Sequence, residues 1–263
     1  MNITHGNLRV ALEMTEDLLL KEGKLVDTSS WQGKHLEDGS LSTIEITNVM
    51  FTVLVPKYQI DLEELIRPSL PWANKHFEER VSRIPYNPPP SHTEWPFWRP
   101  RSEETKEVGS GKFSQTYPER YWPPSGYGIR YSFGNLDDVI NLLIRDPLTR
   151  QANFSIWSME DNGVKYRGRP PCTLNYFFLC REGKLNIFYD IRSCDILRHF
   201  RDDIFLTCRL LLWVLDQLKS SNNDFWKSIG PGTLTMHIYS LHIFLTDKPI
   251  LEYQRKMGRK PYE

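Results

Sequence analysis

The residues of this chain that could do chemistry gather in the stretch PPCTLNYFFLCREGKLNIFYDIRSCD, which spans 170–195. The residues REGK separate two strand-like runs, and Gly183 supplies the backbone freedom of a tight turn, so the stretch predicts a β-hairpin. If the turn centres on Glu-Gly, facing residues have numbers that sum to 365. Unless a bulge shifts this register, Cys172 then lies opposite Ser193 and beside Arg192. The sequence thus predicts a thiol, a hydroxyl and a guanidinium at one end of a sheet.

A cysteine in such a position is either a nucleophile or part of the core. In the functional interpretation, Arg192 and Ser193 hold an anion, and the local positive field favours the thiolate of Cys172. Free cysteine is commonly buried, so the residues taken alone favour the structural interpretation. The other three cysteines are expected in the core: Cys180, Cys194 and Cys208.

Five other residues could contribute to a binding site. Asp202 and Asp203 precede a predicted buried helix, where an aspartate most often caps free backbone amides. A protonated carboxyl group could instead donate to N3 of cytosine and accept from its amino group, whereas an asparagine amide matches uracil. His237 and Tyr239 share one face of a predicted strand and could bond one sugar hydroxyl, although such a pair usually only packs. Arg150 follows a helix and is typical of exposed surface.

Composition limits the class of protein. At 263 residues the chain can bury a substantial core, and we expect a single domain over residues 1–263. Its 33 basic and 33 acidic residues cancel, which argues against a protein that coats polymeric nucleic acid. The cysteines show no zinc-like spacing, and the chain has no apolar run of membrane-spanning length or leader-like start. We therefore expect a cytoplasmic protein that binds neither metal nor membrane.

The elements that must position these residues follow from periodicity and from turn residues. Helical spacing predicts a helix over 7–22 with Gly23 as its C-terminal cap. Residues 84–126 are rich in proline and tryptophan, which favours an ordered loop region that lines a pocket. The irregular order of helices and strands predicts an α+β fold. Further helices are expected over 60–81, 136–147 and 204–219, the last one buried, and strands over 42–56, 151–159, 172–180, 184–192 and 234–245.

The order of several short motifs resembles that of the thymidylate synthase superfamily. In that family a catalytic cysteine precedes a phosphate-binding Arg-Ser pair by the spacing that separates PPC, ending at Cys172, from RS at 192–193. The segment DPLTRQA at 146–152 resembles the family's DPxSRR, HIY at 237–239 resembles its sugar-binding His-x-Tyr, and TYPERYW at 116–122 weakly resembles its YGxxW. The ordered set covers about residues 110–245. This ordered set of motifs favours a functional role over a structural one for five residues: Cys172, Arg192, Asp203, His237 and Tyr239.

Within the superfamily, the departures resemble phage-type deoxycytidylate (dCMP) hydroxymethylase. Synthases read uracil with an asparagine eleven residues after the phosphate arginine, and this chain has Asp203 there. Thr173 replaces the usual histidine after the cysteine, Ile191 replaces a glutamine, and Gln151 replaces the second arginine of the usual pair. The N-terminal third matches poorly. There the family's water-organising glutamate is expected to be Glu79, with the neighbouring Glu78 as the alternative and a solvated helical face as the structural interpretation.

The resemblance implies a large mixed β-sheet covered by helices and a homodimer formed sheet to sheet. It implies transfer of a one-carbon unit from 5,10-methylenetetrahydrofolate, as co-substrate, to C5 of dCMP with addition of water, through a bond between Cys172 and C6. By the same resemblance, Asp203 and Glu79 take part in catalysis and Asp195 holds the pterin. The nucleotide is bound by Arg192, Ser193, His237, Tyr239 and by Arg150 of the neighbouring subunit. If phage-encoded, the protein would act in the bacterial cytoplasm.

Three other functions stay open from the sequence. The chain could hydroxymethylate CMP, or it could act on dUMP as a hydroxymethylase or a thymidylate synthase. From a different class, it could be a nucleotide- or RNA-binding relative that keeps the pocket without turnover. Release of tritium from carbon 5 of labelled dCMP would separate a binder from an enzyme.

Overall fold

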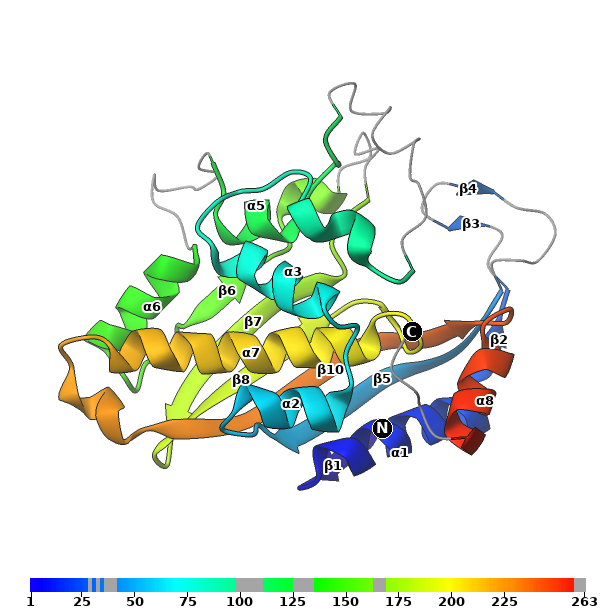
Figure 1. Ribbon diagram of the computed structural model, residues 1–263, viewed down its shortest axis with the longest axis horizontal. Coiled ribbons are helices and arrows are strands. Elements are labelled where there is room, and N and C mark those ends of the chain that lie inside the picture. Colours follow the sequence, from blue (N-terminus) through cyan, green and yellow to red (C-terminus); the bar gives the residue numbers. More distant parts are fainter. Residues whose placement is uncertain are drawn as a thin grey trace.

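Figure 1 shows the computed structural model of the chain, in which helices and strands follow one another in irregular order. The residues that the structure describes are 1–27, 30–31, 34–35, 42–97, 111–124, 135–162 and 169–257.

A mixed β-sheet of eight strands lies at the centre of the described chain. Six strands follow the order β1-β5-β10-β8-β7-β6, while β2 pairs with β5 and β9 pairs with β10. β10 runs antiparallel to β5 but parallel to β8. The predicted α+β fold is therefore confirmed. The strands are β1 (Asn2–His5), β2 (Lys24–Val26), β5 (Thr43–Leu54), β6 (Asn153–Ser155), β7 (Thr173–Arg181), β8 (Lys184–Ile191), β9 (Cys194–Asp195) and β10 (Gly230–Phe244), with β3 (Ser30–Trp31) and β4 (Lys34–His35) as a separate pair.

Helices cover one face of this sheet (Figure 1). The long helix α7 packs on β8 and β10, and α2, α3 and α6 pack on α7 in turn. Since both of its sides are covered, α7 is apolar nearly all round, as its sequence predicted. The helices are α1 (Leu8–Glu22), α2 (Gln59–Ile66), α3 (Trp72–Val81), α5 (Tyr117–Tyr121), α6 (Leu136–Arg145), α7 (Phe200–Lys219) and α8 (Lys248–Met257), with short 3-10 turns at η1 (Pro90–Glu94), η2 (Met159–Asn162) and η3 (Asp224–Ser228).

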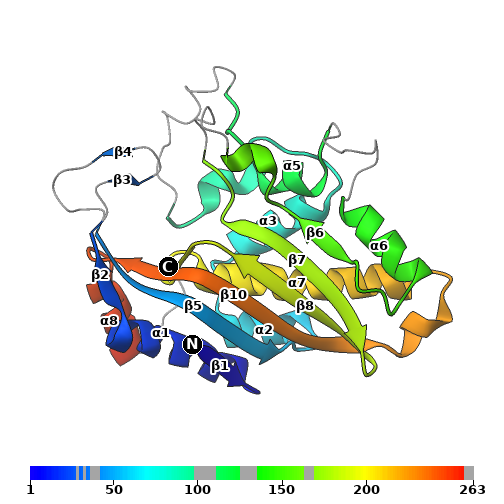
Figure 2. The same ribbon diagram turned by 180° about the vertical axis from the view of Figure 1, so that it is seen from behind.

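The opposite face of the sheet is seen in Figure 2, where none of the described helices lies over β7, β8 or β10. Along β8 the side chains of Ile187 and Tyr189 are buried, whereas Asn186, Phe188 and Asp190 between them are only partly buried. The same alternation runs along β7 and β10. Side chains on this second face are thus half-covered, as expected where alternate residues point away from the core.

The segment 60–81 differs from the single helical run that we predicted. It forms α2 and α3, with residues 67–71 between them. Arg67 ends α2 in the left-handed conformation, at φ 54°. Pro68 and Pro71 lack the N–H groups that a continuous helix needs, so the chain breaks there and α3 starts in a new direction.

Other predicted elements agree more closely with the structure. The helices α1, α6 and α7 and the strands β5, β7, β8 and β10 lie where periodicity predicted them. Gly23 does end α1, but its φ is −63°, so the position does not need a left-handed residue. A Cβ at Gly23 would collide with the side chain of Ile44 and the carbonyl oxygen of Leu19, so close packing of α1 on β5 requires glycine. The strand expected over 151–159 shortens to β6.

The predicted hairpin is confirmed, with one change at its open end. From Asn175↔Asp190 to Arg181↔Lys184, paired residue numbers sum to 365 as predicted. A bulge between Thr173 and Asn175 then shifts the register, so that Thr173 pairs with Ile191. The backbone N–H of Arg192 donates to the carbonyl of Cys172 at 2.9 Å. Cys172 is therefore opposite Arg192, and the predicted pairing with Ser193 is wrong by one residue.

Candidate functional site

A cavity of about 200 Å³ forms where segments distant in sequence meet. Its walls come from α3, from the turn around η1, from residues 113–117, from residues 169–172 and from the start of α7. Cys172, Ser193 and Asp203 all line it. The proline- and tryptophan-rich segment predicted to line a pocket does so in its described part, whereas 98–110 and 125–126 lie outside the described residues.

Cys172 stands directly before β7 and is half-buried, in contrast to the three buried cysteines Cys180, Cys194 and Cys208. Its thiol belongs to the cavity wall. The guanidinium of Arg192 donates to the carbonyl oxygens of Pro171 at 2.9 Å and Pro170 at 3.2 Å. Arg192 thus binds the segment that carries the cysteine and stacks over Trp157, with 5.6 Å between guanidinium and ring centroid. Ser193 lies at the cavity itself.

Asp202 and Asp203 lie inside the first turn of α7, so the N-cap role expected of them does not apply. Asp202 instead accepts hydrogen bonds from the backbone N–H of Ser69 at 2.7 Å and from its hydroxyl at 2.9 Å. Burial raises the pKa of the Asp203 carboxyl to about 7, although the Arg80 guanidinium opposes this shift. Burial therefore makes the protonated carboxyl accessible near neutral pH, and in that form Asp203 can donate as well as accept a hydrogen bond.

Helix α3 presents Trp72, His76 and Arg80 to the cavity, at successive intervals of four residues. Glu79, the predicted water-organising carboxylate, is not part of the cavity wall. It accepts hydrogen bonds from the N–H of Ser91 at 2.6 Å and from its hydroxyl at 2.8 Å. Its other neighbour is the imidazole of His76, with 3.5 Å between Nδ1 and Oε2. The alternative, Glu78, pairs with Arg209 at 2.7 Å and is exposed.

Aromatic rings form two walls of the cavity. Trp72 stacks on His76 at 4.8 Å between centroids, and Trp95 stacks on His199 at 4.6 Å. The indole Nε1 atoms of both tryptophans and the amide oxygen of Gln115 are buried without a hydrogen-bond partner among the described residues. Flat walls with unsatisfied polar atoms suit a planar heteroaromatic ring that carries donors and acceptors of its own, such as a pyrimidine or a pterin.

The remaining predicted residues do not line this cavity. Asp195, in β9, is buried and accepts the N–H groups of Leu197 and Arg198, each at 3.0 Å. His237 and Tyr239 lie on the second face of the sheet, where the imidazole contacts Asn48 at 2.9 Å and the two rings are 4.4 Å apart. Arg150 is exposed after α6.

Several cavity residues escaped the sequence analysis. His76 and Arg80 lie on either side of Glu78 and Glu79 in the sequence and line the cavity. Their i, i+4 spacing on a predicted helix is the signal that could have shown that they lie on one face. Arg169 lines the cavity and comes three residues before Cys172, within RPPC. Trp72 and Trp95 have no such signal, since only the folded chain brings them together.

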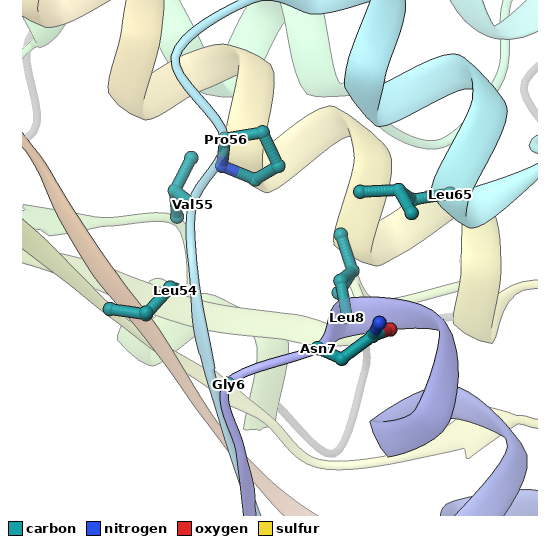
Figure 3. Close-up of a pocket in the computed structure, with 7 residues that line it drawn as sticks. All are labelled: Gly6, Asn7, Leu8, Leu54, Val55, Pro56 and Leu65. Carbon is teal, nitrogen blue, oxygen red and sulfur yellow. The ribbon is translucent and has the colours of Figure 1, made fainter.

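A second hollow, shown in Figure 3, carries no comparable chemistry. It lies between the start of α1 and the end of β5, and its lining consists of Gly6, Asn7, Leu8, Leu54, Val55, Pro56 and Leu65. None of these side chains titrates or acts as a nucleophile.

No three His, Cys, Asp or Glu side chains of the described residues are grouped so that they could hold a metal ion. No described helix is long and apolar enough to cross a membrane.

Comparison with known proteins places the chain in a family. The family model described as Thymidylate synthase matches residues 92–261, a stretch that includes Cys172, Ser193 and Asp203. A thymidylate synthase of Rhizorhabdus wittichii is 24% identical over 153 residues, which are 53% of this chain and 47% of that protein. The match thus spans about half the length of this relative. The chain belongs to the thymidylate synthase family.

Proposed function

We propose that the protein transfers a one-carbon unit from 5,10-methylenetetrahydrofolate to C5 of dCMP and adds water, giving 5-hydroxymethyl-dCMP and tetrahydrofolate. Membership of the thymidylate synthase family supports folate-dependent chemistry at a pyrimidine. The observation that carries the choice of substrate is that Cys172 and Asp203 line one cavity while burial holds the pKa of Asp203 at about 7.

Cys172 is the proposed nucleophile. Its thiolate adds to C6 of the ring, which makes C5 an enamine carbon that can attack an electrophile. When bound, methylenetetrahydrofolate supplies that one-carbon electrophile. The aromatic pairs around Trp72 and Trp95 would form the walls of its binding site. Once C5 has bonded to the one-carbon unit, loss of the C5 proton and departure of tetrahydrofolate would leave a methylene group on the ring, to which water adds. Expulsion of the Cys172 thiolate from C6 restores the aromatic pyrimidine and releases the product.

Asp203 is the proposed base reader. In its protonated form, the carboxyl donates a hydrogen bond to N3 of cytosine and accepts one from the 4-amino group. Uracil presents the opposite pattern, with a donor at N3 and an acceptor at O4, so it pairs with an amide instead. The carboxyl also supports the change of charge at N3 as the ring accepts the thiolate.

Glu79 is the proposed organiser of the attacking water. This carboxylate lies 3.5 Å from the imidazole of His76, which lines the cavity. Hydrogen bonds from His76 and Ser91 outweigh the effect of burial and lower the pKa of Glu79, so it is ionised at neutral pH.

The nucleotide and folate contacts follow the family resemblance. By that resemblance, Arg192 and Ser193, with Arg150 from a partner subunit, would hold the 5′-phosphate. His237 and Tyr239 would hold the sugar and Asp195 the pterin, although none of these three lines the described cavity. Ser193 lies in the cavity wall and Arg192 beside it. The exposed position of Arg150 suits a contact with a second subunit. The uncovered face of the sheet in Figure 2 is the surface that a sheet-to-sheet homodimer would use.

The test is a panel of dCMP, CMP and dUMP, each with and without methylenetetrahydrofolate, with the mass of the product as readout. We expect dCMP to gain the mass of a hydroxymethyl group only when the folate is present. Thymidylate or 5-hydroxymethyl-dUMP from dUMP, with no reaction of dCMP, would reject the cytosine assignment and support the alternative. Hydroxymethylation of CMP in preference to dCMP would move the assignment to the ribonucleotide.

Cys172→Ala tests the nucleophile. We expect turnover to fall by about three orders of magnitude or more, because no other described thiol lines the cavity. Cys180→Ala is the matched control, since that thiol lies in β7, the strand that Cys172 directly precedes, but does not line the cavity. Substantial hydroxymethylation by folded Cys172→Ala protein would rule out the covalent route.

A non-catalytic relative that only binds nucleotide or RNA is the remaining alternative. It would leave the hydrogen at carbon 5 in place. Release of tritium from [5-³H]dCMP by the wild-type protein, and its loss in Cys172→Ala, would exclude that alternative.

A further inference from the structure

Arg80 is a buried cation without an anionic partner. Its side chain is 5% exposed, and no carboxylate forms an ion pair with it in the part of the chain that the structure describes. The guanidinium stacks on the ring of Tyr117, 4.0 Å from its centroid, and lines the same cavity as Cys172 and Asp203. A buried charge that lacks a partner is costly, so a conformation that keeps it points to a use for that charge.

The orientation of Arg80 is set by a hydrogen bond to His76, which lies one turn earlier on α3. Arg80 Nε donates to His76 Nε2 at 3.1 Å, which requires the proton of a neutral imidazole to be on Nδ1. Nδ1 faces the Glu79 carboxylate at 3.5 Å, and Ser91 holds that carboxylate from the other side. Burial, reinforced by the charge of Arg80, lowers the pKa of His76 to about 4, so the imidazole is neutral at pH 7.

Asp203 is the carboxyl group that this cation can influence most directly. Groups from every element around it act on it or respond to its charge: Arg80 of α3, Asp202 of its own helix, Cys194 of β9, Tyr189 of β8 and Tyr117 of α5. Arg80 is the cation among them. The Sγ of Cys194 lies 3.9 Å from Asp203 Oδ2 and is a weak donor.

We propose that Arg80 is a specificity-determining positioning residue, held over the cavity by Glu79 and His76, and that its charge sets how readily Asp203 keeps the proton with which it reads cytosine. This assignment builds on the proposed role of Asp203 as base reader. It also gives the predicted carboxylate Glu79 a second task, which is to fix the imidazole that orients the guanidinium.

The proton balance of Asp203 follows from two opposed effects. Burial favours the neutral carboxyl, and Arg80 favours the carboxylate. Loss of the guanidinium removes the second effect, so the carboxyl should hold its proton to higher pH. Arg80→Lys keeps a positive charge and should keep most of the effect, although it loses the hydrogen-bond geometry that Nε provides.

The experiment titrates the apoprotein, labelled with ¹³C at the aspartate carboxyl groups, by NMR, with Asp203→Asn to identify the signal. In Arg80→Met we expect the midpoint of Asp203 to rise by about one pH unit or more relative to wild type. His76→Phe, which removes the acceptor of Arg80 Nε, should raise the midpoint by less, and Arg80→Lys should leave it near the wild-type value. The matched control is Arg83→Met, because Arg83 follows the end of α3, is exposed and pairs with Asp137 at 2.8 Å.

An unchanged midpoint in folded Arg80→Met would overturn the assignment. If Arg80→Met does not fold, His76→Phe decides, because it retains the charge of Arg80 and a flat ring but removes the acceptor that orients the guanidinium. An unchanged midpoint in His76→Phe would likewise overturn the assignment. The titration needs neither nucleotide nor folate. The result of the titration therefore does not depend on whether the protein hydroxymethylates dCMP. An unchanged midpoint would reject the role of Arg80 even if the protein is an active enzyme.

Discussion

At the scale of single residues, Asp203 combines two properties that its sequence position alone does not reveal. It lies within the first turn of α7 and faces a cavity, and burial raises its pKa to about 7. A carboxyl with an ordinary pKa would be ionised at neutral pH and would repel N3 of cytosine, which carries a lone pair. The raised pKa keeps the proton available in the range where the proposed reaction must occur.

This yields a prediction for the pH dependence of binding. Because the protonated carboxyl is the form that matches cytosine, the affinity for dCMP should fall about tenfold per pH unit once the pH exceeds the pKa of about 7. Calorimetric titrations with dCMP between pH 5.5 and 8.5 would measure this slope. Asp203→Asn should remove the slope and move the preference from dCMP toward dUMP. An unchanged preference in that variant would refute the base-reading role.

At the scale of the element, the β7–β8 hairpin determines where the proposed nucleophile lies. Its turn has Glu182 at φ 52° and Gly183 at φ 70°, a pair of left-handed residues as in a type I′ turn. Glycine adopts that conformation freely, whereas glutamate does so at a cost. The bulge at the other end of the hairpin then sets Cys172 opposite Arg192.

Substitutions in the turn should therefore change stability in opposite directions. Glu182→Asn should raise the free energy of unfolding by about 0.5 kcal/mol, and Gly183→Val should lower it by about 1 kcal/mol or more. Urea unfolding monitored by circular dichroism would measure both, with the exposed Lys184→Ala as control. Equal stabilities for the two turn variants would contradict the strain assigned to Glu182.

At the scale of the whole molecule, the sheet divides the described chain into a helical side and an uncovered side (Figures 1 and 2). Phe177 and Phe188 lie opposite one another on the uncovered side, with ring centroids 6.3 Å apart. Half-covered aromatic side chains on a sheet face are what a sheet-to-sheet partner would bury. The proposed homodimer and the proposed contact of Arg150 with the neighbouring site both depend on this face.

Introducing charge there should separate the subunits. We expect the double variant Phe177→Arg and Phe188→Arg to sediment as a monomer of 31.0 kDa in analytical ultracentrifugation, whereas the wild type sediments at twice that mass. Ile60→Arg, at an exposed position of α2 on the helical side, is the control and should leave the mass unchanged. A monomeric wild type would exclude the dimer and the role of Arg150 in the partner's site.

The amino-acid sequence by itself determined the main elements, because periodicity and turn residues act over a few positions of the chain. It predicted β5, β7, β8, β10, α1, α6 and α7, and the α+β class followed from their order. The order of the motifs around Cys172 also pointed to the thymidylate synthase family, which the family match now shows. Asp203 could be singled out for the same reason, since its place is counted along the chain from Arg192.

Only the tertiary structure decided which side chains face the cavity. His76 and Arg80 approach Asp203 across more than a hundred residues of sequence, and no local pattern encodes such a distance. The bulge that moves Cys172 by one pairing position, and the contact that turns Glu79 toward Ser91, depend on how separate elements pack. Local sequence sets the backbone conformation of each segment, whereas the direction and charge of a side chain in a site depend on the burial and the neighbours that only the assembled fold supplies.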